Sequence, residues 1–490
     1  MVGGGTAGWI AAAILVRALP NIDLDITVVE SPDIGTVGVG EATIPPILDL
    51  LRFLSIDEAN FVQQTQATYK LGIKFTNWGR IGESYWHPFG TFGVPINRRP
   101  FFQAFLKAQA AGMKPRFNDF SLCAALGDTD GFRFPDARAD GPASGLRYAL
   151  HFDAGLVARY LRVYAERLGV KRLEKTVSTA TQRADGFLSS LTFSDGTSHA
   201  ADLFIDCSGF RGVLIEQVLH TGYEDWTQWL PCDRAVAMPT ASTLPRPPLT
   251  QAIARPAGWR WRIPLQQRAG NGYVYSSRHI DDDIALADLI NQVGPGEADP
   301  KFLRFTTGRR KAFWNKNVVA LGLASGFLEP LESTSIHLAI SGVYNLLDHF
   351  PDLDFEPANT AAYNAELAAE MNHIRDFIIL HYCGTRRDDT AFWRGCATME
   401  LPDTLRERIE LYRRSGRIPN RPGELFTDVS WFYIYEGLGL RPDRYDPLMD
   451  VVPMAQFRDI MGKLATATGQ AARDSKPHDA FFPALSKPVE

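Results

Sequence analysis

The stretch Val2-Gly3-Gly4-Gly5-Thr6-Ala7-Gly8 decides the fold of this chain. Gly3, Gly5 and Gly8 match the pattern G-x-G-x-x-G, which allows a tight turn and lets backbone N–H groups approach a pyrophosphate at a helix N-terminus. Residues 9–19 have the periodicity of a helix, and residues 25–30 form a second strand. Glu30 ends this strand, where an acid accepts hydrogen bonds from a ribose diol. A purely structural turn is the alternative, but strand, helix, strand and acid occur in the order of a dinucleotide site. The predicted contacts are Gly3, Gly5, Thr6, Ala7, Gly8 and Glu30.

The rest of the chain alternates strands and helices early and clusters helices late. The predicted strands lie at residues 71–78, 190–193, 203–206, 259–264, 272–276 and 317–321. Helices dominate after Ser335, notably at residues 361–382, and a tail rich in proline and charge after about residue 470 is the only tract expected to be disordered. The first strand is a stub at Val2, whereas a buried parallel strand runs about five residues, so we expect the native chain to begin upstream.

Composition excludes several classes of function. Of 490 residues, 45% are hydrophobic and 22% charged, which is ordinary for a soluble globular protein, and the net charge of -5 offers no basic excess for nucleic acid. The five cysteines form no CxxC pair and the histidines form no HExxH motif, so neither a disulfide framework nor a metal site is expected. The apolar run 10–19 is short and contains Arg17, which argues against a membrane span or a signal peptide. A cytoplasmic enzyme is the simplest interpretation.

A second segment favours FAD over NAD as the dinucleotide. Residues 201–210 (ADLFIDCSGF) read as a hydrophobic strand that ends in a turn of small residues, which looks like the second FAD-contact strand of flavoprotein monooxygenases. No second G-x-G-x-x-G is present for a nicotinamide nucleotide, so we expect the flavin to be reduced elsewhere. The predicted fold is α/β: an FAD-binding, Rossmann-like, monooxygenase-type module with a mixed sheet over residues 1–350, and a C-terminal helical substrate lobe over residues 351–490.

Five ordered segments resemble the flavin-dependent tryptophan halogenases. They are the glycine turn at residues 2–9, GVGEATIP at 38–45, WRWRIP at 259–264, YVYSS at 273–277 and EPLEST at 329–334. The W-x-W-x-I-P pattern distinguishes these halogenases from related hydroxylases. The resemblance covers residues 1 to about 350 well and the remainder more loosely, and it adds Gly40, Glu41 and Ala42 to the FAD contacts.

The resemblance implies a reaction in two compartments. FAD reduced by a separate flavin reductase reacts with oxygen and a halide ion, chloride or bromide, to give hypohalous acid. This acid passes through a tunnel to a lysine beside a small aromatic substrate. The resemblance implies neither a nucleic-acid partner nor a membrane, and a homodimer is a possible assembly.

Lys70 and Glu332 match the family's two catalytic residues. An ammonium can polarise hypohalous acid, or an amine can carry the halogen, and burial favours either role. A carboxylate can polarise the halogenating species and accept the proton that the arene loses. The structural alternatives are a solvated surface lysine and an acid at a helix start. Lys74 is expected to face solvent or a structural partner, and Glu329 to be structural.

The halide site is expected at Thr334 and Ser335, just before the predicted helix 336–350. Unpaired N–H groups at a helix start attract an anion, and the family binds halide there with backbone amides. This chain has serine at position 335 where the family usually has glycine, so the side chain can narrow the site or change the backbone. An ordinary Ser/Thr N-cap is the structural alternative.

Aromatic residues are predicted to line the substrate pocket. His87 and Phe89 match a family segment that flanks the arene, and an aromatic-rich region further along adds Phe426, Trp431 and Phe432, for which ordinary helix core is the alternative. The family's tyrosine pair and glutamate that hold the amino-acid end of tryptophan are replaced here by residues 417–423 (RIPNRPG). Free tryptophan is therefore a doubtful substrate, and an indole or another electron-rich arene fits better.

Two other functions stay open. An FAD-dependent aromatic hydroxylase generally carries a Gly-Asp motif late in the flavin domain, but residues 322–326 (GLASG) lack the acid. A non-catalytic flavin-binding protein is the second alternative, and the presence of both Lys70 and Glu332 argues against it.

Overall fold

The computed structural model describes residues 1–33, 40–138 and 141–483, which fall into two compact units. The first unit combines residues 1–67, 152–234 and 303–372, and the second combines residues 68–151, 235–302 and 373–490. Each unit is therefore built from three separate pieces of chain. The expected functional division near residue 350 stays a prediction.

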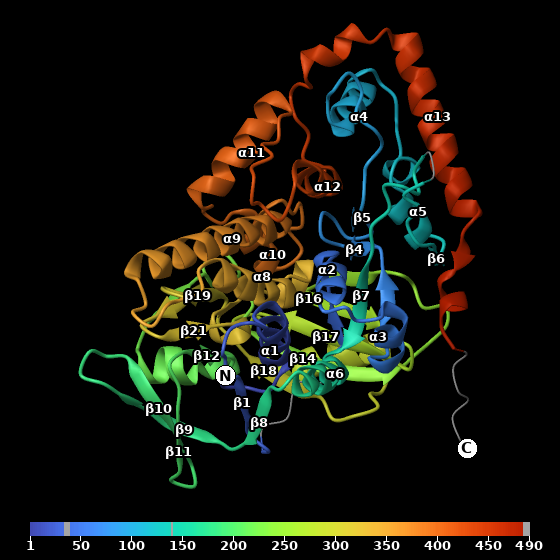
Figure 1. Ribbon diagram of the computed structural model, residues 1–490. Helices are drawn as coiled ribbons and strands as arrows, with labels where there is room; N and C mark the ends of the chain where they lie inside the picture. The colour runs from blue at the N-terminus through green and yellow to red at the C-terminus, as the bar shows by residue number, and fades with distance from the viewer. Residues whose placement is uncertain (34–39, 139–140, 484–490) are drawn as a thin grey trace. The chain divides into compact units, whose positions relative to one another are not determined.

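The first unit has a parallel sheet at its centre (Figure 1). Val2 forms single bridges to Val29 and Asp206, and so it joins β1 to β12 between the two neighbouring pairs. The predicted stub of a strand is confirmed in this form. The strands, in spatial order, are β8 (Lys171–Glu174), β1 (Thr27–Glu30), Val2, β12 (Phe204–Asp206), β21 (Val318–Ala320) and antiparallel β20 (Trp314–Asn315).

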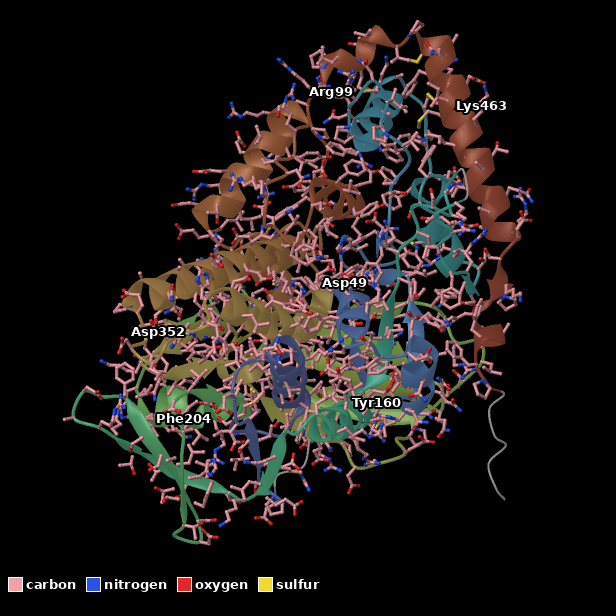
Figure 2. The ribbon with its side chains drawn as sticks, viewed as in Figure 1. Asp49, Arg99, Tyr160, Phe204, Asp352 and Lys463 are labelled. Atoms are coloured by element: carbon pink, nitrogen blue, oxygen red, sulfur yellow. The ribbon has the colours of Figure 1, made fainter. Side chains whose placement is uncertain are left out.

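Helices pack around this sheet because packing buries their apolar faces. Helix α1 (Thr6–Ala18) is buried over most of its length and contacts α6 and α8. In Figure 2, the labelled Tyr160 comes from α6; its ring meets Phe61 edge to face at 5.2 Å. The helices of this unit are α2 (Pro46–Phe53), α3 (Glu58–Gln64), α6 (Ala154–Arg167), η2 (Gly209–Arg211), η3 (Val213–Val218), η4 (Gly322–Ala324), η5 (Pro330–Glu332), α8 (Ser335–Asp348) and the start of α9 (Pro357–Cys383).

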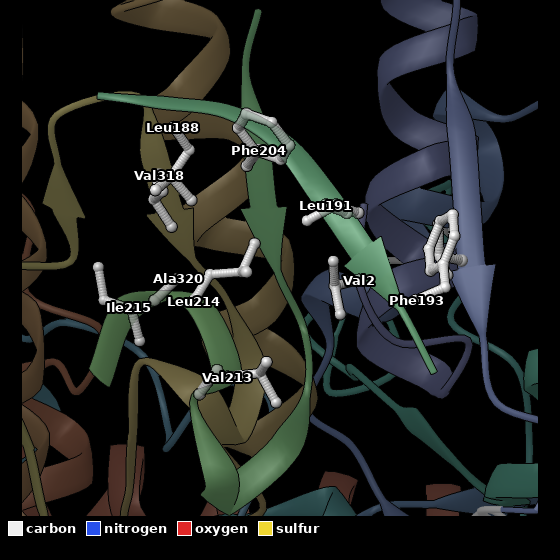
Figure 3. Close-up of a cluster of buried hydrophobic side chains, with 12 residues drawn as sticks. Val2, Leu188, Leu191, Phe193, Phe204, Val213, Leu214, Ile215, Val318 and Ala320 are labelled. Atoms are coloured by element: carbon white, nitrogen blue, oxygen red, sulfur yellow. The ribbon is translucent and has the colours of Figure 1, made fainter. Parts of the chain in front are cut away.

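An antiparallel sheet of three strands packs on one end of this core. Figure 3 shows Leu188, Leu191 and Phe193 of β10 beside Val2 and Phe204, all buried. Burial of such side chains contributes roughly 1.5–3 kcal/mol each. The remaining strands of the unit are β2 (Gly40–Ala42), β9 (Val177–Gln182), β10 (Leu188–Phe193), β11 (Ser198–Ala200), β13 (Tyr223–Asp225), β19 (Gly308–Arg310) and β22 (Gly326–Phe327).

The second unit contains a mixed sheet of seven strands. Their order is β18 (Lys301–Arg304), β14 (Arg234–Ala241), β17 (Arg268–Tyr275), β16 (Gly258–Pro264), β15 (Thr250–Arg255), β4 (Gly72–Thr76) and β5 (Ser84–Pro88). The W-x-W-x-I-P segment is β16, paired antiparallel on both sides, with Trp259 1% exposed. The motif therefore supplies a central strand and a buried aromatic face.

Beside this sheet, β3 (Thr68–Lys70) pairs antiparallel with β7 (Ala149–Asp153). The unit's other elements are α4 (Phe101–Ala110), η1 (Phe117–Asp119), α5 (Leu122–Gly127), β6 (Gly131–Phe132), α7 (Asp282–Val293), α10 (Ala391–Ala397), α11 (Asp403–Ser415), α12 (Asp428–Leu438), η6 (Pro447–Val451), α13 (Met454–Arg473), β23 (Lys476–Pro477) and η7 (His478–Phe481). The predicted α/β class, the mixed sheets and the late cluster of helices are thus confirmed.

The expectation of a disordered tail after about residue 470 is wrong for residues 471–483. Strand β23 pairs with β6, His478 is fully buried, and Asp479 binds Arg246 with a distance of 2.6 Å between Arg246 Nε and Oδ1. The composition of the segment is that of a tail, but long-range contacts order it.

Among the described residues, no helix is long and apolar enough to cross a membrane, and no group of three or more histidine, cysteine or acidic side chains is arranged to hold a metal.

Candidate active site

The glycine turn has the geometry of a phosphate cradle. Gly3 has a φ of +115°, and a Cβ there would lie 2.2 Å from the carbonyl oxygen of Cys207. A Cβ at Gly8 would lie 2.0 Å from Gly3 O, so both glycines are required for close packing. At Gly5, in contrast, a Cβ would meet no atom within 4 Å. Helix α1 begins at the next residue, and the N–H groups of its first turn, which have no intrahelical partner, form the positive end of the helix. A pyrophosphate fits this open position.

Glu30 lies where the sequence predicts, at the end of β1. Its carboxylate accepts a hydrogen bond from Trp9 Nε1 at 3.3 Å, pairs with Arg172, and lies 3.8 Å from Arg162. These partners hold the acid in place beside the turn. Its contact with a ribose stays a prediction.

The segment 201–210 forms β12 and a turn that Asp206 organises. The Asp206 carboxylate is fully buried and accepts hydrogen bonds from the backbone N–H groups of Ser208, Leu214 and Ile215 at 2.8–3.0 Å. This acid therefore closes the turn beside the glycine cradle. Sequence reasoning identified the strand but not the role of its last residue.

The structure describes only part of the GVGEATIP segment. Gly38 and Val39 lie outside the described residues, whereas Gly40, Glu41 and Ala42 form β2. Burial raises the pKa of Glu41 to about 7. The predicted contact of these three residues with FAD stays a prediction.

Glu332 and the predicted halide residues lie on the short connection from η5 to α8. Glu332 is 1% exposed and ends η5, so it is not an acid on a solvated helix start. Ser333 follows with a φ of 61°, a left-handed conformation that costs a residue with a side chain of order 1–3 kcal/mol. This strained residue turns the chain between η5 and α8, so that the helix begins at Ser335, three residues after Glu332.

Thr334 does not behave as an ordinary N-cap. It precedes α8 with helical φ and ψ and makes no capping hydrogen bond through its side chain. Its Oγ1 is buried and has no hydrogen-bond partner among the described residues. Ser335 is the first residue of the helix, where any L-residue adopts the backbone conformation, so glycine is not needed there. The first-turn amides of α8, which have no intrahelical partner, and one buried hydroxyl together suit a small anion.

In the second unit, Lys70 is completely buried, which rules out a solvated surface lysine. It ends β3, and its Nζ lies 5.2 Å from the centroid of the Phe89 ring. Lys74, by comparison, is one-third exposed and pairs with Asp128 at 2.8 Å, as predicted for a residue with a structural partner. The two lysines of one segment therefore have opposite environments.

The structure brings His87, Phe426 and Trp431 together around one ring, that of Phe377. Phe426 stacks on Phe377 at 3.8 Å, Trp431 meets it edge to face at 5.0 Å, and His87 lies 5.4 Å away. Pairing of β4 with β5 and the hydrogen bond from Phe89 N–H to Leu71 O connect this cluster to the segment of Lys70. We name His87, Phe377, Phe426 and Trp431 the aromatic wall.

Phe432 does not join the aromatic wall. Its ring packs on Phe92 and Phe102 at 5.6 and 5.2 Å, inside a cluster of phenylalanines. Neighbouring residues on a helix point about 100° apart, so Trp431 and Phe432 face different partners. This packing is that of ordinary core, and a substrate contact for Phe432 stays untested.

Sequence reasoning missed three charged or titratable residues next to the aromatic wall. Glu424 Oε1 accepts from Arg408 at 2.5 Å and lies 3.3 Å from His373 Nδ1, and the Arg408 guanidinium lies 4.4 Å from the Trp431 ring. Each of these side chains is at most 13% exposed. No local pattern marks them, because Arg408 and Glu424 are separated by a loop and His373 lies on α9.

The glycine cradle, the acid that ends β1 and the turn after β12 are the features expected of an α/β protein that binds a dinucleotide. The comparisons with known proteins agree. Residues 1–454 match the family model of tryptophan halogenase. The chain is 35% identical to tryptophan 7-halogenase RebH of Lentzea aerocolonigenes, over 93% of this chain and 92% of that protein.

Solved structures resemble the chain over almost its whole length. Xcc4156, a flavin-dependent halogenase from Xanthomonas campestris, is 45% identical with a TM-score of 0.94 and covers 99% of this chain and 98% of its own. BrvH, a flavin-dependent halogenase from Brevundimonas sp. BAL3, is 42% identical with a TM-score of 0.94 and covers 98% of this chain and 97% of its own. The chain belongs to the tryptophan halogenase family. It is an enzyme, a flavin-dependent halogenase, and halogenases of this family take a small aromatic substrate and a separate flavin reductase.

Proposed function

We propose that this enzyme uses reduced FAD, oxygen and chloride or bromide to halogenate a neutral, electron-rich arene of the indole type by way of Lys70 and Glu332. When reduced FAD is bound, it activates oxygen, and the two together supply the oxidising equivalents that convert halide into hypohalous acid. The observation that carries the proposal is the complete burial of Lys70 over Phe89. Burial of a lysine is costly because its charge loses hydration, so a lysine sequestered from solvent beside an aromatic ring is a strong candidate for a functional group.

Each residue has one task in this scheme. The glycine cradle at Gly3, Gly5 and Gly8 holds the pyrophosphate of FAD, and the amides around Thr334 and Ser335 hold the halide. Lys70 binds or carries the electrophilic halogen through Nζ. The Glu332 carboxylate takes the proton that the arene loses when halogen replaces hydrogen.

The substrate is proposed to lack a free ammonium and carboxylate. Glu424, the carboxylate beside Trp431, already forms an ion pair with Arg408 through Oε1 and lies 3.3 Å from His373 Nδ1, so the Arg408 guanidinium balances its negative charge inside the protein. Charge-assisted hydrogen bonds contribute roughly 1.5–3 kcal/mol each. Loss of two such contacts lowers the affinity for tryptophan by about a hundredfold or more. A neutral indole loses nothing, because it needs only the aromatic wall.

The test is product formation followed by mass spectrometry with a flavin reductase, NADH, FAD and each halide. Wild-type protein should give a halogenated arene, and Lys70→Ala should give none while reduced flavin is still oxidised. Lys74→Ala is the matched control, because it changes a partly exposed lysine of the same segment that pairs with Asp128. Halogenation by Lys70→Ala at the rate of wild type would remove Lys70 from the mechanism. A homodimer and a cytoplasmic location are further parts of the proposal, to be checked by light scattering and by cell fractionation.

A further inference from the structure

Within the second unit, a buried histidine hydrogen-bonds the strand that carries Lys70 to its neighbours. In the pairing of β3 with β7, Thr68 lies opposite His151 and Lys70 lies opposite Ala149. Residues two apart on a strand project from the same face, so Thr68 and Lys70 share a face. His151 is fully buried, as are Thr68 and Lys70, and Thr250 is 3% exposed.

The hydrogen bonds around His151 determine its tautomer. The Thr68 hydroxyl donates to the carbonyl oxygen of Pro264 at 2.6 Å, since a carbonyl can only accept. With its proton committed, Thr68 Oγ1 accepts from His151 Nδ1 at 3.2 Å, which places a proton on Nδ1. His151 Nε2 lies 2.9 Å from Thr250 Oγ1, and in the neutral ring it accepts from that hydroxyl. One chain of bonds thus joins β3 and β7 to the ends of β15 and β16.

The charge state of the ring agrees with this assignment. Burial, followed by the positive charge of Lys70 and by His478, holds the pKa of His151 well below its usual range. The ring is therefore neutral at physiological pH. It satisfies both hydroxyls without adding a second positive charge beside Lys70.

We propose that His151 is a positioning residue for halogenation, which fixes β3 and so holds the Lys70 amine over Phe89. The inference rests on the proposed role of Lys70. An apolar side chain would fill the same volume, whereas three buried polar groups are costly unless all are hydrogen-bonded. Their network holds the strand in one register, and a displacement of about 1 Å at a reacting group can cost roughly a hundredfold in rate.

The experiment compares three substitutions with a matched control. His151→Phe removes both ring bonds and keeps a planar side chain, Thr68→Val removes the bonds to His151 and Pro264, and Thr250→Val removes the bond to Nε2. The control is Thr385→Val, another buried threonine of the second unit, whose hydroxyl donates to Trp78 O at 2.7 Å. It also loses the bond that its Oγ1 accepts from Arg387 N–H at 3.2 Å, so it removes two hydrogen bonds, as Thr68→Val does, away from β3.

Steady-state kinetics, product formed per reduced flavin oxidised, FAD binding and Tm are measured for each. His151→Phe should lower kcat by about tenfold or more, since Lys70 loses its position. KM for the arene and FAD binding should stay within about twofold, and less product should form per flavin oxidised because hypohalous acid escapes. Thr68→Val should behave similarly, and adding it to His151→Phe should cause little further loss, since both break one network. Thr385→Val should lower Tm without changing product per flavin.

The inference would be overturned if folded His151→Phe kept the kcat of the parent. It would also be overturned if Thr385→Val lost as much product per flavin as His151→Phe for the same fall in Tm. If His151→Phe fails to fold, Thr68→Val and Thr250→Val decide, since each changes only one hydroxyl. Lys70→Ala separates the two levels of the proposal. Full halogenation by Lys70→Ala refutes the proposed function, whereas an inactive Lys70→Ala beside a fully active His151→Phe refutes only the positioning role.

Discussion

The substitution Asp479→Asn tests whether the C-terminal segment is an integral part of the second unit. Arg246 is 2% exposed, and its Nε lies 2.6 Å from Asp479 Oδ1. The backbone N–H of Arg246 donates to the other carboxylate oxygen at 3.1 Å, and its guanidinium also binds Gln266 O and lies over Phe482. Asparagine keeps the shape but removes the negative charge, which leaves a buried guanidinium without its counter-ion.

The structure sets the size of the effect. Removal of one partner from a buried ion pair costs about 3–5 kcal/mol. The Asp479 side chain is 25% exposed, so water recovers part of this cost and we expect a loss of about 2–3 kcal/mol. Because a unit of this size shifts by roughly 2–4 °C per kcal/mol, Tm should fall by about 4–12 °C.

Scanning calorimetry of Asp479→Asn and the parent measures the shift. The control is Asp459→Asn on α13, which removes the pair with Lys463, the lysine labelled in Figure 2. Both members of this control pair are more than half exposed, so Tm should not change measurably. An unchanged Tm in Asp479→Asn would show that the segment does not stabilise the unit.

Four further outcomes are expected. Deletion of residues 476–490 should lower halogenation as well as Tm, because Phe482 stacks on Tyr69 at 5.5 Å, directly beside Lys70; activity equal to that of the parent after deletion would contradict this. The purified protein with NADH alone should reduce almost no flavin, as followed by absorbance. Rapid reduction without a reductase would contradict the prediction that the chain lacks a nicotinamide site. Indole should give a higher kcat/KM than tryptophan and react mainly at C3, its most nucleophilic carbon, as assigned by NMR; efficient halogenation of the benzo ring of tryptophan would imply a substituted clamp. Burial raises the pKa of Glu41 from 4.5 to about 7, so between these pH values the folded state binds more protons than the unfolded state, and its stability falls as pH rises. Glu41→Gln should therefore raise Tm near pH 8 and not near pH 4.5. An equal shift of Tm at both pH values would exclude this titration as the cause.

The sequence alone determined the features that depend on neighbouring residues. The glycine turn, the helix after it and the position of Glu30 follow from short-range rules on backbone conformation and periodicity, and the structure has them at α1 and β1. Lys70 and Glu332 became candidates through the resemblance to the tryptophan halogenases, which short motifs carry. Their burial was not readable, because a motif contains no information on what covers it.

The tertiary structure decided everything that depends on distant partners. The composition after residue 470 predicts disorder, yet Arg246, more than two hundred residues earlier, orders Asp479. Trp431 and Phe432 look equivalent in sequence because α12 is buried on most of its surface, and only packing shows which ring reaches the aromatic wall. His151 contacts Thr68 and Thr250 at separations of 83 and 99 residues. Local patterns report backbone preference, whereas a buried polar network exists only once the chain has brought its members together.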